Sequence, residues 1–163
     1  MQHRLFLFAL IFIVGDAFAA RAYVGNVSHV TDGDTLWVQP DRGGPPRKLR
    51  IDGIDAPEIC QPGGEAARNA LVQHVLNHRV RVSVRRNDMY GRGLARIQLE
   101  GRDVGALMVS AGQAWSYRWR RDAGPYAAEE SVARQHHLGL FVSGQPEQPR
   151  DFRKRHGSCH TTR

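Results

Sequence analysis

Apolar and polar residues alternate over several short stretches of the chain, and this period of two is typical of strands with one buried face. Over residues 79–86, for example, Val80, Val82 and Val84 alternate with arginine and serine. Each stretch is bounded by residues that favour turns, such as glycine, proline and aspartate. The predicted strands are residues 23–30, 34–39, 47–54, 79–86 and 94–99.

Other stretches place apolar residues three and four positions apart, as amphipathic helices do. In the first of them, Ala67, Leu71 and Val75 fall on one face. Asp103 is a candidate N-cap and Gly112 a candidate C-terminal glycine for the second. The predicted helices are residues 65–77, 104–111 and 126–137. This order of elements predicts an α+β, mainly β fold, a five-stranded OB-fold barrel with three helices.

Residues 1–22 do not fit this fold. His3 and Arg4 precede an unbroken apolar run, and a small-residue pattern that includes Ala17 and Ala19 follows it. Such a segment is typical of a signal peptide and too short to span a bilayer, although an uncleaved anchor is the alternative. We therefore expect an exported protein, periplasmic or secreted. Its OB-fold domain would cover residues 23–142, and a basic, polar and solvated tail would follow over residues 143–163.

Charge and cysteine content narrow the class of protein. Lysine and arginine outnumber aspartate and glutamate, 23 to 16, so the net charge is +7. This balance favours a polyanionic partner such as nucleic acid or an anionic membrane, or simply a soluble surface. Cys60 and Cys159 are the two cysteines of the sequence. One bridge between them is expected in an oxidising compartment, and free thiols or a bridge to another chain are the alternatives.

The clearest candidate chemistry lies in residues 49–58, where a predicted strand ends in an acidic loop. A regular pleat would place Arg50 and Asp55 on opposite faces. Both can serve one site only if the chain kinks, and Gly53 is where a bulge costs least. Together with Glu58 they would present a guanidinium and two carboxylates at a strand end. Such a set suits an anionic substrate that is bound through a cation.

Four other features have both a structural and a functional interpretation. Asp34 flanks an Asp-Gly turn signal, where aspartate is also common for its own backbone hydrogen bonds. Arg92 lies between two glycines, which suits either a closely approaching phosphate or an exposed turn. In residues 113–121, Trp115 and its aromatic neighbours could stack on bases or pack in the core. The basic residues of the tail, Arg153 among them, could form a further phosphate-binding arm.

Three motifs occur in a fixed order along the chain. They are Asp32-Gly33-Asp34-Thr35, Arg50 with Asp55-Ala56-Pro57-Glu58, and Tyr90-Gly91-Arg92-Gly93-Leu94. Together they resemble the staphylococcal nuclease, or thermonuclease, family, and the likeness covers residues 23–141. The resemblance implies an OB barrel with three helices and calcium-dependent cleavage of phosphodiester bonds in DNA and RNA.

The resemblance also implies roles for individual residues. They are Asp34, Asp55 and Ala56 as metal ligands, Arg50, Glu58 and Arg92 as catalytic residues, and Tyr90 as a substrate-binding residue. Ala56 would bind Ca²⁺ through its carbonyl, which is available although the reference enzyme has threonine there. Glu58 would be the base for a water that the calcium ion activates, and Arg50 and Arg92 would hold the phosphate.

We therefore expect a monomeric nuclease that acts on DNA, RNA or both and has no stable protein partner. One alternative is a non-catalytic OB-fold module that binds nucleic acid, and another is an envelope-anchored structural domain that contacts anionic polymers. The acidic cluster favours the enzyme, because neither alternative needs a carboxylate such as Glu58 beside two others.

Overall fold

The computed structural model of the protein describes residues 21–118, 121–157 and 159. Its strands are β1 (Arg21–Val30), β2 (Thr35–Pro40), β3 (Arg47–Ile51), β4 (Ile54–Asp55), β5 (Arg79–Asn87), β6 (Gly93–Leu99), β7 (Arg102–Asp103) and β8 (Trp115–Ser116). Its helices are α1 (Gly64–Val75), α2 (Val104–Ser110), α3 (Ala127–Gln135) and α4 (Pro149–His156), with a 3-10 helix, η1 (Gly139–Ser143). The predicted signal peptide lies outside the described residues except for residues 21 and 22, which open β1.

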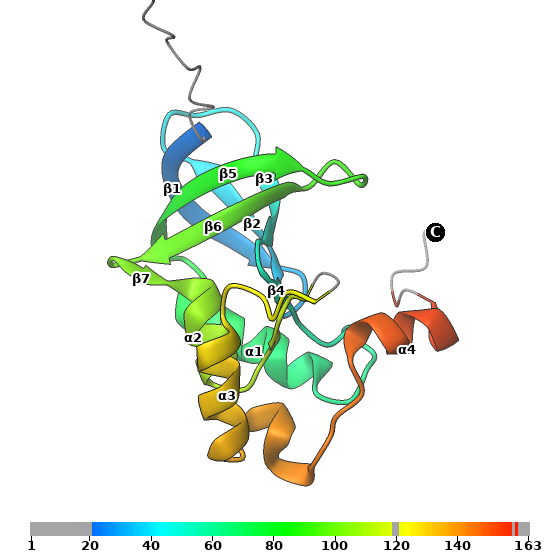
Figure 1. Cartoon of the computed structure of the whole chain (residues 1–163). Helices are drawn as coiled ribbons and strands as arrows, with labels where there is room; N and C mark the ends of the chain where they lie inside the picture. The colour runs from blue at the N-terminus through cyan, green and yellow to red at the C-terminus, as the bar shows by residue number, and fades with distance from the viewer. Residues whose placement is uncertain (1–20, 119–120, 158, 160–163) are drawn as a thin grey trace, which may run out of the picture.

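The longer strands close into a barrel, which confirms the predicted OB-like, mainly β fold. β1 pairs with β2 and β5, β2 pairs with β3, and β5 pairs with β6, all in antiparallel register. A parallel pairing of β3 with β6, in which Leu49 faces Gly93, joins the two ends of the sheet. Closure removes the free sheet edges, and the helices α1, α2 and α3 gather at one end of the barrel (Figure 1).

The alternation along each strand has a direct structural cause. One side chain in two points into the barrel, where the apolar members form a single buried cluster with Ala67, Leu71 and Val75 of α1. These three lie four positions apart, so one face of α1 covers the end of the barrel. The buried strand residues are Val27, Val30, Leu36, Val38, Leu49, Ile51, Val80, Val82, Ala95, Ile97 and Leu99.

The third predicted strand is interrupted, as its glycine indicated. β3 ends at Ile51 and β4 begins at Ile54, and between them Gly53 has a φ of 86°. This left-handed conformation favours glycine, and a Cβ at Gly53 would lie 2.6 Å from a side-chain carbon of Pro125. The kink turns the chain so that Asp55 faces the same side of the barrel as Arg50.

The segment after the second helix packs inward. Trp115 is 3% exposed, and its ring meets that of Phe141 edge-on at 6.0 Å. Trp115 therefore belongs to the core and is not available to stack on bases. Glu130 of α3 is also buried, and it accepts the backbone N–H of Ser116 and pairs with Arg118. These contacts fix β8 to α3.

The prediction of a solvated tail over residues 143–163 is wrong for the part that the structure describes. α4 forms there, with Pro149 in its first turn and the side chain of Phe152 buried. A disulfide joins Cys60 to Cys159, with 5.8 Å between their Cα atoms, which confirms the predicted internal bridge. α4 lies beyond β4, to one side of the other helices (Figure 1).

Among the described residues, no helix is long and apolar enough to cross a membrane.

Candidate active site

Arg50 joins two buried carboxylates on neighbouring elements. Asp34 directly precedes β2 and Asp55 ends β4, and both are nearly inaccessible, at 2% and 6% exposed. One guanidinium nitrogen of Arg50 lies 2.8 Å from Asp34 Oδ1 and the other lies 2.7 Å from Asp55 Oδ1. The register of β2 with β3, in which Thr35 faces Arg50, sets the first contact, and the kink at Gly53 sets the second.

Asp34 is held by further hydrogen bonds. The Thr35 hydroxyl donates to its Oδ1 at 2.9 Å, and the backbone N–H of Ala56 donates to its Oδ2 at 3.2 Å. Asp32 Oδ1 accepts the backbone N–H of Asp34 at 3.0 Å, which is the turn chemistry that aspartate commonly provides. The turn therefore positions Asp34, which confirms the structural interpretation of these aspartates.

Burial and charge shift the pKa values of this cluster. Burial, and then repulsion by Asp34, raise the pKa of Asp32 to about 7. Burial also raises the pKa of Asp55, against the opposing effect of Arg50. For Arg50, burial disfavours the charge, but the neighbouring carboxylates more than offset it and raise the pKa of the guanidinium. Burial and mutual repulsion therefore disfavour the charged form of these carboxylates, and Arg50 partly offsets the effect at Asp55.

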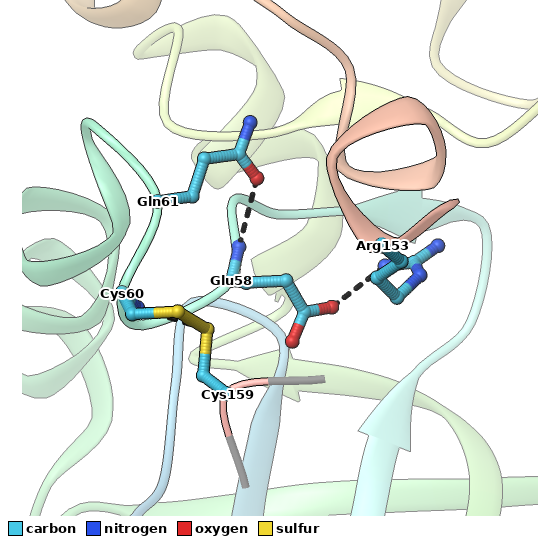
Figure 2. Close-up of a disulfide and its surroundings, with 5 residues drawn as sticks. All are labelled: Glu58, Cys60, Gln61, Arg153 and Cys159. Atoms are coloured by element: carbon cyan, nitrogen blue, oxygen red, sulfur yellow. Dashed lines mark hydrogen bonds and ion pairs between the residues drawn. A yellow bond between two sulfur atoms is a disulfide. The ribbon is translucent and has the colours of Figure 1, made fainter. Parts of the chain in front are cut away.

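Glu58 lies on the loop that follows β4, and its carboxylate points to α4 (Figure 2). Its Oε1 is 2.8 Å from a guanidinium nitrogen of Arg153, which also reaches Asp55 at 3.3 Å. The side-chain oxygen of Gln61 accepts the backbone N–H of Glu58 at 3.2 Å and so fixes the loop. Glu58 is thus next to Asp55, as the acidic loop predicted.

Arg92 is presented by the loop between β5 and β6. Its Nε is 2.7 Å from Asp88 Oδ2, and its guanidinium carbon lies 5.3 Å from the centre of the exposed Tyr90 ring. Burial would raise the pKa of Asp88, but hydrogen bonds from Arg92 and Tyr90 outweigh it and lower that pKa. Among the described residues, no hydrogen bond or ion pair joins Arg92 or Tyr90 to the cluster of Asp34, Arg50 and Asp55.

The oxygen atoms available here suit a hard cation. Among the residues that the structure describes, no three carboxylate, imidazole or thiol groups converge on one point. A cation held by Asp34 and Asp55 would therefore need carbonyl or water oxygens as well. Sparse oxygen sites of this kind typically bind calcium weakly, at about 10⁻⁴ to 10⁻³ M. Carboxylate, carbonyl and water oxygens are the types of ligand that calcium binds, so the residues present fit calcium.

The sequence predicted the cluster of Arg50, Asp55 and Glu58 and a phosphate-binding arm in the tail, but not the helix α4 that places Arg153 against this cluster. Arg153 lies 98 residues from Asp55 in sequence, and its place at the site depends on long-range docking. Two local signals were available in the sequence: Pro149 as a helix start, and the spacing of Phe152 and His156, whose rings stack 4.6 Å apart. They predict a short helix, although not where it packs.

Comparison with known protein families gives an independent view of this chain. Residues 48–143 match the family model described as "Staphylococcal nuclease homologue". "Protein ParB" of Escherichia coli is 36% identical over 141 residues, which cover 80% of this chain and 78% of that protein. "Micrococcal nuclease" of Shigella flexneri is 34% identical over 142 residues, 80% of each chain.

A plant relative shares only the domain. "Staphylococcal-like nuclease CAN1" of Arabidopsis thaliana is 36% identical over 107 residues, which cover 66% of this chain and 33% of that protein. The chain therefore spans about a third of the length of this relative, but most of the length of the two bacterial ones. The family match includes Arg50, Asp55, Glu58 and Arg92 and begins after Asp34.

Proposed function

The chain belongs to the staphylococcal nuclease family, and on that premise we propose that it is a calcium-dependent nuclease that hydrolyses phosphodiester bonds of DNA or RNA. The observation that carries the proposal is the buried pair of carboxylates, Asp34 and Asp55, bridged by Arg50 with Glu58 beside them. Two of the three relatives described above are named as nucleases.

Asp34, Asp55 and the carbonyl of Ala56 would hold the calcium ion. When bound, calcium supplies positive charge that stabilises the phosphate and favours deprotonation of water. Glu58 would accept the proton of the attacking water. A positioned base accelerates a reaction about 10²- to 10⁴-fold, which corresponds to a barrier lowered by about 3 to 5 kcal/mol. Enzymes lower the barrier by about 8 to 23 kcal/mol in total. Most of the barrier reduction must therefore come from other groups.

Arg50 and Arg92 would supply part of the barrier reduction that the base does not provide. Arg50 lies between the carboxylates, so its guanidinium can donate to a phosphate oxygen as well as to Asp55. Arg92 would donate to the same phosphate from the β5–β6 loop. Preorganised cations of this kind stabilise charge that develops on the phosphate oxygens. Tyr90, exposed beside Arg92, would line the nucleotide pocket.

We further propose that the protein acts outside the cytoplasm as a monomer. Residues 1–22 have the pattern of a signal peptide, and disulfides such as Cys60–Cys159 persist mainly in oxidising compartments. Calcium concentrations outside the cell can fill a weak site. The net charge of +7 favours approach to polyanions.

The test is cleavage of single-stranded DNA by the purified protein with calcium, with EDTA, and by the variant Glu58→Gln. We expect calcium-dependent cleavage that EDTA abolishes and that Glu58→Gln lowers by about 10²- to 10⁴-fold. Glu65→Gln is the matched control, because Glu65 is exposed in the first turn of α1. Binding of DNA without cleavage would replace the proposal with a non-catalytic binding module.

A further inference from the structure

α4 is fixed beside the candidate active site by several independent contacts. Phe152 is buried, and the side-chain nitrogen of Gln61 donates to the carbonyl of Glu147 at 2.6 Å. The Cys60–Cys159 disulfide then ties the end of the helix to the loop that carries Glu58 (Figure 2). Contacts before, within and after α4 therefore hold the helix in one place.

Between α4 and the chain that follows β8 lies an open groove of about 730 Å³. Asp55 lines one part of the groove, so it opens onto the candidate active site. Arg118 and Tyr117 line one wall, and Arg150 and Arg153 of α4 line the other. Three arginines and one exposed aromatic ring in a groove are the combination that holds the backbone and bases of single-stranded nucleic acid.

Arg153 is placed to contact a ligand in this groove. Its side chain is 34% exposed, and its guanidinium lies 2.8 Å from Glu58 but 3.3 and 3.4 Å from the oxygens of Asp55. The contacts with Asp55 are long, so Arg153 has donors to spare for another acceptor.

The ion pairs with these carboxylates do not imply that Arg153 blocks the active site. Arg50 makes shorter contacts of the same kind with Asp34 and Asp55, and the proposed function nevertheless assigns it to the phosphate. A cation bound between Asp34 and Asp55 would neutralise the charge of Asp55, which Arg50 and Arg153 now both balance, and would leave Arg153 its contact with Glu58. Each arginine would then be able to direct its fork to a phosphate oxygen.

We propose that α4 forms the second wall of the nucleic-acid groove, and that Arg153 binds a backbone phosphate of a single-stranded substrate next to the phosphate that is cleaved. This inference rests on the proposed nuclease function, and it adds a phosphate-binding residue that lies outside the three sequence motifs. The disulfide is then a positioning element, because it holds α4 against the loop of Glu58.

The test is the salt dependence of binding. Affinity for a fluorescent single-stranded oligonucleotide with cleavage-resistant phosphorothioate linkages is measured with calcium at several salt concentrations for the wild type, Arg153→Ala and Lys154→Ala. Each phosphate contact on a single strand contributes about 0.7 to the slope of log affinity against log salt. We expect Arg153→Ala to lower the slope by about that amount and the affinity by about tenfold.

Lys154→Ala is the matched control. It removes the same charge from the same helix, but Lys154 is exposed and, within the described part of the chain, pairs only with Asp151, so its slope should stay close to that of the wild type. Arg153→Gln provides a second variant that keeps most of the side-chain stem and the packing of α4. We expect it to lower the slope as Arg153→Ala does.

Equal slopes for the wild type and both Arg153 variants would overturn the inference. Faster cleavage by Arg153→Ala than by the wild type would also overturn it, in favour of a residue that blocks the site. Cleavage by the wild type with calcium, measured on the same preparation, reports separately on the proposed function. A wild type that cuts while the Arg153 variants bind normally would refute the role of Arg153 alone.

Discussion

Arg50 shows why arginine rather than lysine occupies the centre of this site. Its two terminal nitrogens reach Asp34 and Asp55 at 2.8 and 2.7 Å, and both carboxylates are buried. A planar fork can contact both at once, whereas an ammonium group is a single point of charge. The same geometry would allow Arg50 to direct one nitrogen to a phosphate and keep the other on a carboxylate.

The corresponding prediction concerns two conservative substitutions. We expect Arg50→Lys and Arg92→Lys each to lower turnover by about a hundredfold or more, because a preorganised donor to the phosphate is lost while the charge remains. Turnover of single-stranded DNA with saturating calcium is the measurement. Arg79→Lys is the control, since Arg79 is exposed and pairs with Asp41. Near-normal turnover in either variant would show that the planar guanidinium is not needed at that position and that positive charge is sufficient.

At the scale of elements, the kink between β3 and β4 decides whether a site exists. Gly53 has a φ of 86°, and a Cβ there would lie 2.6 Å from Pro125. The left-handed backbone at Gly53 turns the chain toward Asp55, and Pro125 leaves no room for a side chain at this position. The site therefore depends on a residue with no functional side chain.

We expect Gly53→Ala to lower the free energy of unfolding by about 1 to 3 kcal/mol more than Gly43→Ala, since only the former adds a clash to the backbone strain. Gly43 is a matched control because its φ is 84° and a Cβ there meets nothing within 4 Å. Denaturant unfolding of both variants measures the difference. Equal losses would show that Pro125 moves away at little cost.

The same scale shows what could be predicted from the sequence. Alternation predicted most of the barrel strands, although the apolar residues of the first are only loosely spaced. The predicted caps Asp103 and Gly112 are confirmed, because Asp103 accepts the N–H of Ala106 and Gly112 has a φ of 67°. These are local signals. α4 was missed because Phe152 is its only large apolar residue in a charged run, so it has no helical hydrophobic period.

The contacts of the candidate site residues also divide into those that a local sequence pattern predicts and those that join distant parts of the chain. The meeting of Arg50 with Asp55 followed from a strand pattern and one glycine, all within six residues. The contact of Glu58 with Arg153 joins positions 95 residues apart, and no local pattern specifies it. The roles of these residues in binding calcium or phosphate stay predictions.

At the scale of the whole molecule, one covalent bond links the loop of the candidate base to the end of the chain. Cys60 and Cys159 are 99 residues apart, so the bond closes a loop that contains the strands β5 to β8 and all four described α-helices. Closing so long a loop restricts the unfolded chain strongly. The disulfide is therefore expected to stabilise the whole domain as well as to hold α4 in position.

We expect Cys159→Ser to lower the free energy of unfolding by about 2 to 5 kcal/mol. Denaturant unfolding with and without a reducing agent is the measurement. The wild type should lose stability when reduced, and the variant should not respond to the reductant. If reduction left the stability of the wild type unchanged, the bond would contribute little beyond the docking of α4.

The bond between Cys60 and Cys159 also changes what a protease can do to this protein. Residues 144–148 connect η1 to α4 and are the natural place for a cut, because all five are exposed or partly exposed and none lies in a helix or strand. A single cut there would leave α4 attached to the barrel through the disulfide. The nicked protein would keep its mass apart from one added water molecule, and its fragments would separate only under reducing conditions.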